Sequence, residues 1–452
     1  MPSAKVLSAP RAVNPWWVAT VAGMASFIDA AVIVGTSTAL VLYQEPLGVS
    51  PEQFGQFSAL LTFSIAVGAL VGGRLGDRFG RRHVFTATLI IVVLGAALSA
   101  LAWDSWVLYL SLITIGLGAG ADLPVSMAMV AESAPESKRG KMITFSHILW
   151  MLGMLSVMLI GIVVGGTGEA GARFIYGFIA VTSVVVIMLR FSLPESREWV
   201  KANDTRTASI ALSDRRARRS DDIGALGHLF RSRFVVPLIA LGLFYAIVNI
   251  AANTNGQFST YLYVNVAGAD VSTASAVSMI SFAASLIGML TLMRLVDTRY
   301  RMLGFAIGAL LSLAGFAIPA LMGVTVPALV AMGVLYSLGG AIAGEPMFKV
   351  WAQELFPTLF RSSAQGIMIA FTRVVAAIVA LFTPGIIAFG PPVLFLFLIV
   401  TTLIAVIIGF FWVNRIPSAE GEAGVGGDGV AVNLDGKPET PGVLPAAEGA
   451  SV

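Results

Sequence analysis

Ionisable side chains interrupt several long apolar stretches of this 452-residue chain. Asp29, Asp122, Glu345, Lys349 and Arg373 each have apolar residues on both sides. A charge in the hydrocarbon region of a bilayer costs about 2.5–3.5 kcal/mol on insertion scales, so such residues mark functional positions or buried ion pairs. The acids could exchange protons, and the bases could bind an anionic group.

Asp29 is the best candidate for proton exchange, because it lies near the middle of the first apolar stretch. A carboxyl group that is shielded from water binds a proton more readily than one in water. The alternative is that Asp29 only hydrogen-bonds neighbouring helices. Asp122 follows a run of glycines that permit close helix contact. It could be a second proton-exchange site or could bind a buried arginine.

Glu345 and Lys349 are four residues apart, so they can pair on one face of a helix. Arg373 has no acid within one helical turn, so its partner must come from another helix, with Asp29 and Asp122 as candidates, or from a substrate. A guanidinium group binds a carboxylate through two parallel hydrogen bonds. We therefore assign all three residues to a candidate substrate site. The alternative is that the charges only neutralise one another.

A polar row occupies the seventh apolar stretch. Its members follow one another at intervals of four residues: Asn249, Asn253, Gln257 and Tyr261. This spacing keeps them on one face of a helix, and amides and phenols supply both donors and acceptors. We predict that the row lines a substrate cavity. His147, Trp150 and Trp351 are interpreted equally as packing residues, interface anchors or site residues.

The elements that must position these residues are membrane-spanning helices. Of the residues, 57% are hydrophobic and 12% are charged, whereas soluble domains carry roughly 45–50% and about 25%. Apolar stretches long enough to span a bilayer lie at 16–43, 54–73, 83–102, 106–131, 142–165, 172–193, 234–266, 274–293, 303–323, 327–353, 364–388 and 391–413. The sequence predicts an all-α membrane protein with twelve transmembrane helices in two pseudo-symmetric six-helix bundles. It excludes a cytosolic enzyme, a disordered protein and, since cysteine is absent, a disulfide scaffold.

Basic residues concentrate in alternate loops, at Arg74, Arg78, Arg81, Arg82, Lys138, Arg139, Lys141, Arg294, Arg299, Arg301 and Arg361. The positive-inside rule therefore predicts that both termini and the central loop are cytoplasmic, with the chain in the plasma (inner) membrane. We divide the chain into an N-terminal segment at 1–15, a bundle at 16–193, a central loop at 194–233, a second bundle at 234–413 and a tail at 414–452. The tail lacks aromatic residues and is predicted to be disordered.

Two loop motifs occur once in each half. Arg74-Leu75-Gly76-Asp77 matches Arg294-Leu295-Val296-Asp297. Glu132, with Arg139 seven residues beyond it, matches Glu354 with Arg361. The two motifs are separated by nearly the same interval in each half, so one duplication explains both. Many transporters are built from paired repeats, with the substrate site between the halves.

These motifs also carry a family resemblance. The run from Gly72 to Arg82 resembles the loop signature of the major facilitator superfamily. Glu132 to Gly140, Pro194-Glu195-Ser196-Arg197-Glu198-Trp199, and Glu354-Leu355-Phe356-Pro357 with Arg361 resemble its sugar-porter-like branch. The resemblance implies alternating access and a proton-coupling role for Asp29. It also implies a cytoplasmic gate of Arg74, Asp77, Arg78, Arg82, Glu132, Arg139, Asp297, Glu354 and Arg361. The alternative is that the arginines only set topology.

Several positions that contact sugar in that branch differ here, namely Leu112, Met154, Ala252, Asn253 and Lys349. Arg361, Gly366, Arg373 and Pro384 instead resemble the pattern of organic-acid:proton symporters. We therefore expect a secondary transporter, not an enzyme, that moves a small polar metabolite such as an organic or sugar acid together with protons.

Neutral sugar or polyol symport and proton-coupled metabolite or drug efflux are the alternatives, and a transport-dead sensor is a further class. We expect no cofactor, no metal and no nucleic acid partner. The expected partners are the solute, protons and the lipid bilayer, and the protein is expected to be a monomer.

Overall fold

The computed structural model describes residues 13–135, 138–196, 200, 234–296, 298–356 and 358–417. Within these residues the regular elements are helices, and 12 of them are long and apolar enough to cross a membrane. The all-helical, twelve-span prediction is therefore confirmed. Most of the predicted tail, most of the central loop and Asp297 lie outside the described residues, as do the side chains of Asp77, Arg139 and Arg361.

The first half contains α1 (Pro15–Leu47), α2 (Pro51–Phe79), α3 (Arg81–Ala100), α4 (Ser105–Ser133), α5 (Arg139–Val164) and α6 (Glu169–Arg190). Local signals set the boundaries. Gly48, with a φ of 62°, ends α1 in the left-handed region that glycine tolerates best. Ser50 and Gln53 then form a reciprocal capping box that starts α2.

The second half contains α9 (Val235–Tyr261) with a π-helical extension (Leu262–Val266), α10 (Val271–Leu295), α11 (Arg301–Met322), α12 (Val326–Ala343), α13 (Glu345–Leu355), α14 (Thr358–Ala388) and α15 (Pro391–Ile407). The tenth apolar stretch is broken at Gly344, a break that the sequence did not predict. Pro346 favours it, because proline fits the first turn of a new helix.

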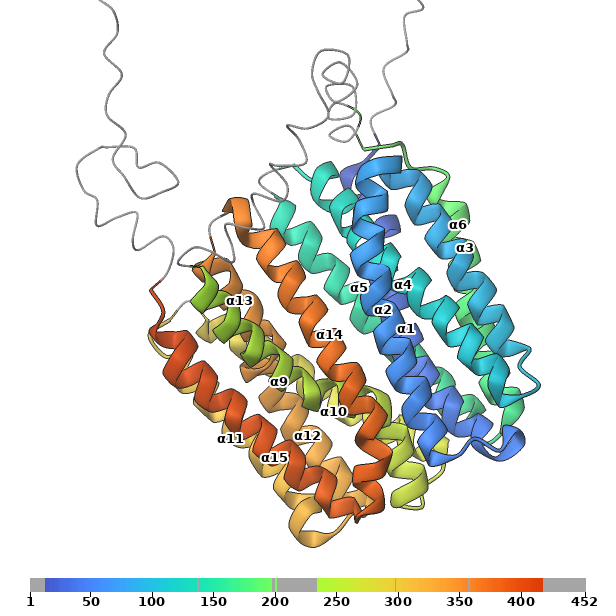
Figure 1. The fold of residues 1–452 in the computed structure, drawn as a ribbon, viewed down its shortest axis with the longest axis vertical. Helices are drawn as coiled ribbons and strands as arrows, with labels where there is room; N and C mark the ends of the chain where they lie inside the picture. The colour runs from blue at the N-terminus through green and yellow to red at the C-terminus, as the bar shows by residue number, and fades with distance from the viewer. Residues whose placement is uncertain are drawn as a thin grey trace, which may run out of the picture.

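The two halves are related by an approximate two-fold rotation. Across the boundary between them, α2 contacts α14 (Figure 1), α5 contacts α10, and α1 contacts α9. In the order of the spans these pairs are second with eleventh, fifth with eighth and first with seventh. Exchanging the halves swaps the first two pairs and keeps the third, as a two-fold axis requires.

Glycines allow the halves to approach closely at both symmetry-related contacts. A Cβ atom at Gly55 on α2 would lie 2.7 Å from the Cγ atom of Pro384 on α14. A Cβ atom at Gly161 on α5 would lie 2.3 Å from the hydroxyl oxygen of Ser275 on α10. The halves therefore pack backbone against side chain here, as small residues permit in membrane helices.

Hydrogen bonds join the halves at the ends opposite the basic loops. The Ser37 hydroxyl donates to the Gln257 carbonyl (2.6 Å), and the Gln257 amide donates to Thr62 (2.6 Å). The Asn265 amide donates to Gln44 (2.7 Å). We call Ser37, Gln44, Thr62, Gln257 and Asn265 the outer seam, since the predicted orientation places them outside. These contacts between the halves lie at the outer end, and we infer from them that this end is closed.

Candidate functional site

Ionisable side chains from both halves lie close enough together to interact electrostatically. We call Asp29 on α1, His147 on α5, Glu345 and Lys349 on α13, and Arg373 on α14 the central charge cluster. Asp29 interacts electrostatically with Arg373 and Glu345, and His147 interacts with Glu345 and Lys349. The structure thus brings together four of the five charged residues that interrupt apolar stretches of the sequence, namely Asp29, Glu345, Lys349 and Arg373.

Glu345 and Lys349 form the pair that their spacing predicts, with Lys349 Nζ 2.9 Å from Glu345 Oε1. Solvent nevertheless reaches 43% of the Glu345 side chain and 55% of the Lys349 side chain. Both residues also interact with groups on the opposite half. Because the outer seam is closed, we infer that water enters the space between the halves from the basic end.

Asp29 is only 3% exposed. The indole N–H of Trp150 on α5 donates to its Oδ2 atom (3.2 Å), and the Trp150 ring stacks on His147 with an interplanar angle of 3°. Within the described part of the chain, Oδ1 has no hydrogen-bond partner. A buried carboxyl with one unoccupied oxygen is a suitable place for a proton.

Arg373 is half-buried and lies close enough to Asp29 for their charges to interact. Among the residues that the structure describes, it makes no hydrogen bond and no close ion pair, although the charges of Asp29 and Glu345 act across the gap. A guanidinium group carries five N–H donors. These donors are therefore available to a ligand.

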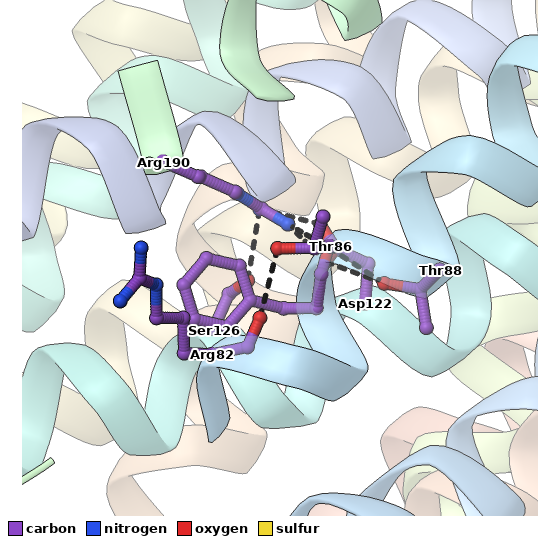
Figure 2. A network of polar contacts seen from close by, with 7 residues as sticks. Arg82, Thr86, Thr88, Asp122, Ser126 and Arg190 are labelled. Atoms are coloured by element: carbon purple, nitrogen blue, oxygen red, sulfur yellow. Dashed lines mark hydrogen bonds and ion pairs between the residues drawn. The ribbon is translucent and has the colours of Figure 1, made fainter. Parts of the chain in front are cut away.

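Asp122 lies elsewhere, inside the first half (Figure 2). Arg190 on α6 binds both of its oxygens, at 2.6 and 2.8 Å, and Thr88 donates a further hydrogen bond at 2.9 Å. Arg190 also contacts Ser126 (3.1 Å) and lies 4.4 Å above the Phe85 ring. Of the two predicted alternatives for Asp122, the structure favours the buried arginine over the proton site.

The polar row of α9 divides into two parts. Gln257 belongs to the outer seam, and Tyr261 packs on the Phe54 ring of α2 at 4.9 Å between centroids. Asn253 accepts a hydrogen bond from Gln257 (2.8 Å), and Asn249 is buried with its side-chain oxygen unpaired within the described residues. The substrate-binding prediction for this row stays a prediction, with Gln257 in the outer seam and Tyr261 packed on α2.

The acids of the basic loops have partners that the motif spacing did not predict. Glu132 pairs with Arg81 at 2.9 Å, and Glu354 pairs with Arg301. Arg301 occupies in the second repeat the position that Arg81 occupies in the first, so the same ion pair occurs once in each half. A sequence feature that could have indicated these two ion pairs is that each arginine follows the aspartate of the repeated motif by four residues.

Other predicted gate residues have different surroundings. Arg74 and Arg78 are exposed, and Arg78 lies 5.2 Å from the centroid of the Phe79 ring.

The Glu195 carboxylate accepts hydrogen bonds from the backbone N–H groups of Arg81 and Arg82, at 2.9 and 3.2 Å. It thereby caps α3, whose own N-cap residue is a glycine and has no side chain.

Comparisons with known proteins identify the family of the chain. Residues 19–358 match the family described as the Major Facilitator Superfamily. The minor myo-inositol transporter IolF of Bacillus subtilis is 30% identical over 370 residues, which are 81% of this chain and 83% of the relative. The niacin transporter NiaP of Acinetobacter baylyi is 33% identical over 181 residues, 40% of each chain.

A crystal structure of a D-xylose-proton symporter superposes with a TM-score of 0.70 at 20% identity, covering 90% of this chain and 98% of the other. At that identity the superposition shows the shared fold alone. The family match and the IolF relative identify the family. The chain belongs to the major facilitator superfamily and is a transporter of its sugar-porter-like branch.

Proposed function

We propose that this transporter takes up a small polar metabolite with an acidic group together with a proton. Asp29 is the proton site and Arg373 is the anion site. The observation that carries the proposal is the position of these two residues. The acid lies on one half and the base, with its N–H donors available, lies on the other, at a distance where their charges interact.

Charge balance couples the two ligands. Glu345 and Lys349 neutralise each other, so the remaining charges of the cluster are those of Asp29 and Arg373. When Asp29 accepts a proton, the positive charge of Arg373 is left without its counter-charge in a partly dehydrated space. An anionic substrate restores the balance, because an uncompensated charge is costly there. Proton and anion therefore bind together, which is symport.

The described conformation corresponds to the step in which the transporter releases its substrate and proton into the cytoplasm. The outer seam is closed, and the Glu345–Lys349 pair is accessible to solvent. With the basic loops in the cytoplasm, as the positive-inside rule predicts, the binding space faces the cytoplasm. Alternating access then requires the halves to rock about the central site.

Symport of a neutral cyclic polyol is the second candidate. It is favoured by the relative IolF, whose name assigns it myo-inositol, and by the amides of Asn249 and Asn253. Amides donate to and accept from hydroxyl groups equally well. The two candidates differ in the charge that crosses the membrane.

Uptake into proteoliposomes under an imposed pH gradient separates the candidates. The panel contains myo-inositol, gluconate and nicotinate, each tested with the membrane potential clamped at zero or inside-negative. A monocarboxylate that enters with one proton moves no net charge, so its uptake should not depend on the potential. A polyol that enters with one proton should be accelerated by an inside-negative potential. Accumulation of myo-inositol alone would refute the anion proposal.

A further inference from the structure

One hydrogen bond fixes the carboxyl group of Asp29, and it comes from Trp150. The indole N–H contacts Oδ2 at 3.2 Å, while Oδ1 is buried without a partner in the described part of the chain. The two oxygens of one carboxyl group are therefore not equivalent. One is held by the protein, and the other is available.

The packing of α5 against α1 holds the indole in place. A Cβ atom at Gly153, one turn beyond Trp150, would lie 2.3 Å from the backbone oxygen of Phe27, two residues before Asp29. This close approach leaves no room for α5 to shift towards α1. His147 stacks on the indole with a centroid distance of 5.7 Å and supports the ring. Donor and acceptor thus lie on two helices that are packed together.

The other groups that act on Asp29 come from the opposite half. They are Arg373 on α14 and Glu345 on α13. The helices α4 and α6 also pack on α1, but their charges are paired elsewhere. Asp122 and Arg190 bind each other, Glu132 pairs with Arg81 on α3, and Glu169 pairs with Arg173. When the halves rock, the contributions of Arg373 and Glu345 change, whereas Trp150 stays with Asp29 because both belong to the first half.

We propose that Trp150 is a positioning residue of the proton site, which holds Oδ2 of Asp29 throughout the transport cycle so that proton exchange takes place at Oδ1. This inference rests on the proposed role of Asp29 in coupling. A donated hydrogen bond favours the ionised form of a carboxyl group. Trp150 therefore helps Asp29 to release its proton once the site faces the cytoplasm.

The test is an infrared pH titration of the purified, substrate-free transporter in lipid nanodiscs, which follows the C=O stretch of protonated carboxyl groups. The variant Trp150→Phe keeps an aromatic ring and removes the N–H donor. Trp351→Phe is the matched control, because the Trp351 indole is also buried but its N–H has no partner among the described residues. Asp29→Asn identifies the signal of Asp29.

We expect an infrared band of protonated Asp29 that is present in the wild type and absent from Asp29→Asn. In Trp150→Phe the pH midpoint of this band should rise by about one unit or more. The reason is that a hydrogen bond to a charged group contributes at least tenfold in an equilibrium constant. Trp351→Phe should titrate like the wild type. An Asp29 band with the same midpoint in Trp150→Phe would overturn the positioning role and leave the coupling proposal intact. The absence of any Asp29-dependent band would overturn the coupling proposal itself.

A second variant covers the case in which Trp150→Phe does not fold. Gly153→Ala places a methyl group against the Phe27 carbonyl and should push α5, with its indole, away from Asp29. Its midpoint should move in the same direction as that of Trp150→Phe. Gly177→Ala on α6 is the control, because a Cβ atom there meets nothing within 4 Å. An unshifted midpoint in a folded Gly153→Ala variant would count against the positioning role.

Discussion

The two halves differ in helix continuity at one pair of equivalent prolines. The fourth span of the first half contains Asp122 and Pro124. Pro124 lies eight residues before Glu132, and Pro346 lies eight residues before Glu354, so the two prolines occupy equivalent positions. Gly344 and Glu345 directly precede Pro346. Around Pro124 the helix α4 continues, whereas around Pro346 the span breaks into α12 and α13. Pro124 is therefore tolerated inside a continuous helix, whereas the equivalent Pro346 lies at the start of a new helix.

The charges beside the two prolines also have different environments. Asp122 is buried and bound by Arg190 inside its own half, with 3% and 0% of their side chains exposed. Glu345 and Lys349 are solvent-accessible and face the opposite half. We infer that the first half uses its buried ion pair for cohesion, whereas the second half presents its charges to the binding space. Four predictions test this division.

The largest effect is expected on stability, from Arg190→Ala. This variant leaves Asp122 buried without its counter-charge, which should lower the free energy of unfolding by about 3–5 kcal/mol. Denaturant or thermal unfolding in detergent measures the loss. Arg173→Ala on the same helix removes an exposed pair with Glu169 and should cost about 0–1 kcal/mol. Equal stability of the two variants would contradict the cohesive role.

Lys349→Met should behave in the opposite way, with nearly wild-type stability and reduced transport. The side chain is more than half exposed, but its loss leaves the charge of Glu345 uncompensated beside the proposed anion site at Arg373. Uptake of an anionic substrate should fall about tenfold, equivalent to roughly 1.4 kcal/mol. Adding Glu345→Gln should restore part of it. Normal uptake by the single variant would place the pair outside the binding space.

Gly344→Ala tests whether the helix break matters. A Cβ atom there would lie 2.4 Å from the carbonyl oxygen of Gly340, so the end of α12 must rearrange. Transport rate should fall several-fold with little change in the amount of folded protein. Gly340→Ala, whose Cβ would meet Tyr336 at an ordinary 3.7 Å, is the control. Similar rates for both variants would show that the break itself is unimportant.

The smallest difference is expected between the repeated ion pairs of the basic loops. Arg81 is 12% exposed and Arg301 is 25% exposed, so Arg81→Gln should destabilise the protein more than Arg301→Gln. Both losses should be within about 1 kcal/mol, as for partly exposed pairs. Thermal unfolding of the two variants side by side provides the measurement. A larger loss for Arg301→Gln would reverse the expected order.

The spanning helices were predictable from the sequence because apolar length is a strong local signal. The break at Gly344 was not, since glycine and proline are tolerated in continuous membrane helices, as α4 demonstrates. The family was predictable because its loop motifs are local runs of residues, and the family match confirms it.

The site was only partly predictable. Asp29, Glu345, Lys349 and Arg373 stood out one by one as charges in apolar stretches, but their convergence depends on how the helices are rotated in the bundle. Arg190 lies at the end of a span, where an arginine usually marks the cytoplasmic side of the membrane. Its burial was therefore not predictable from the sequence. Trp150 was indistinguishable from a packing residue until its N–H was seen to contact Asp29.

The central claim is that a proton on Asp29 and an anion on Arg373 move together. The most direct test compares wild type and Asp29→Asn in proteoliposomes, for substrate exchange without a gradient and for accumulation driven by a pH gradient. Because Asn mimics the protonated acid, the variant should retain exchange and lose pH-driven accumulation. Full accumulation by Asp29→Asn would contradict the account.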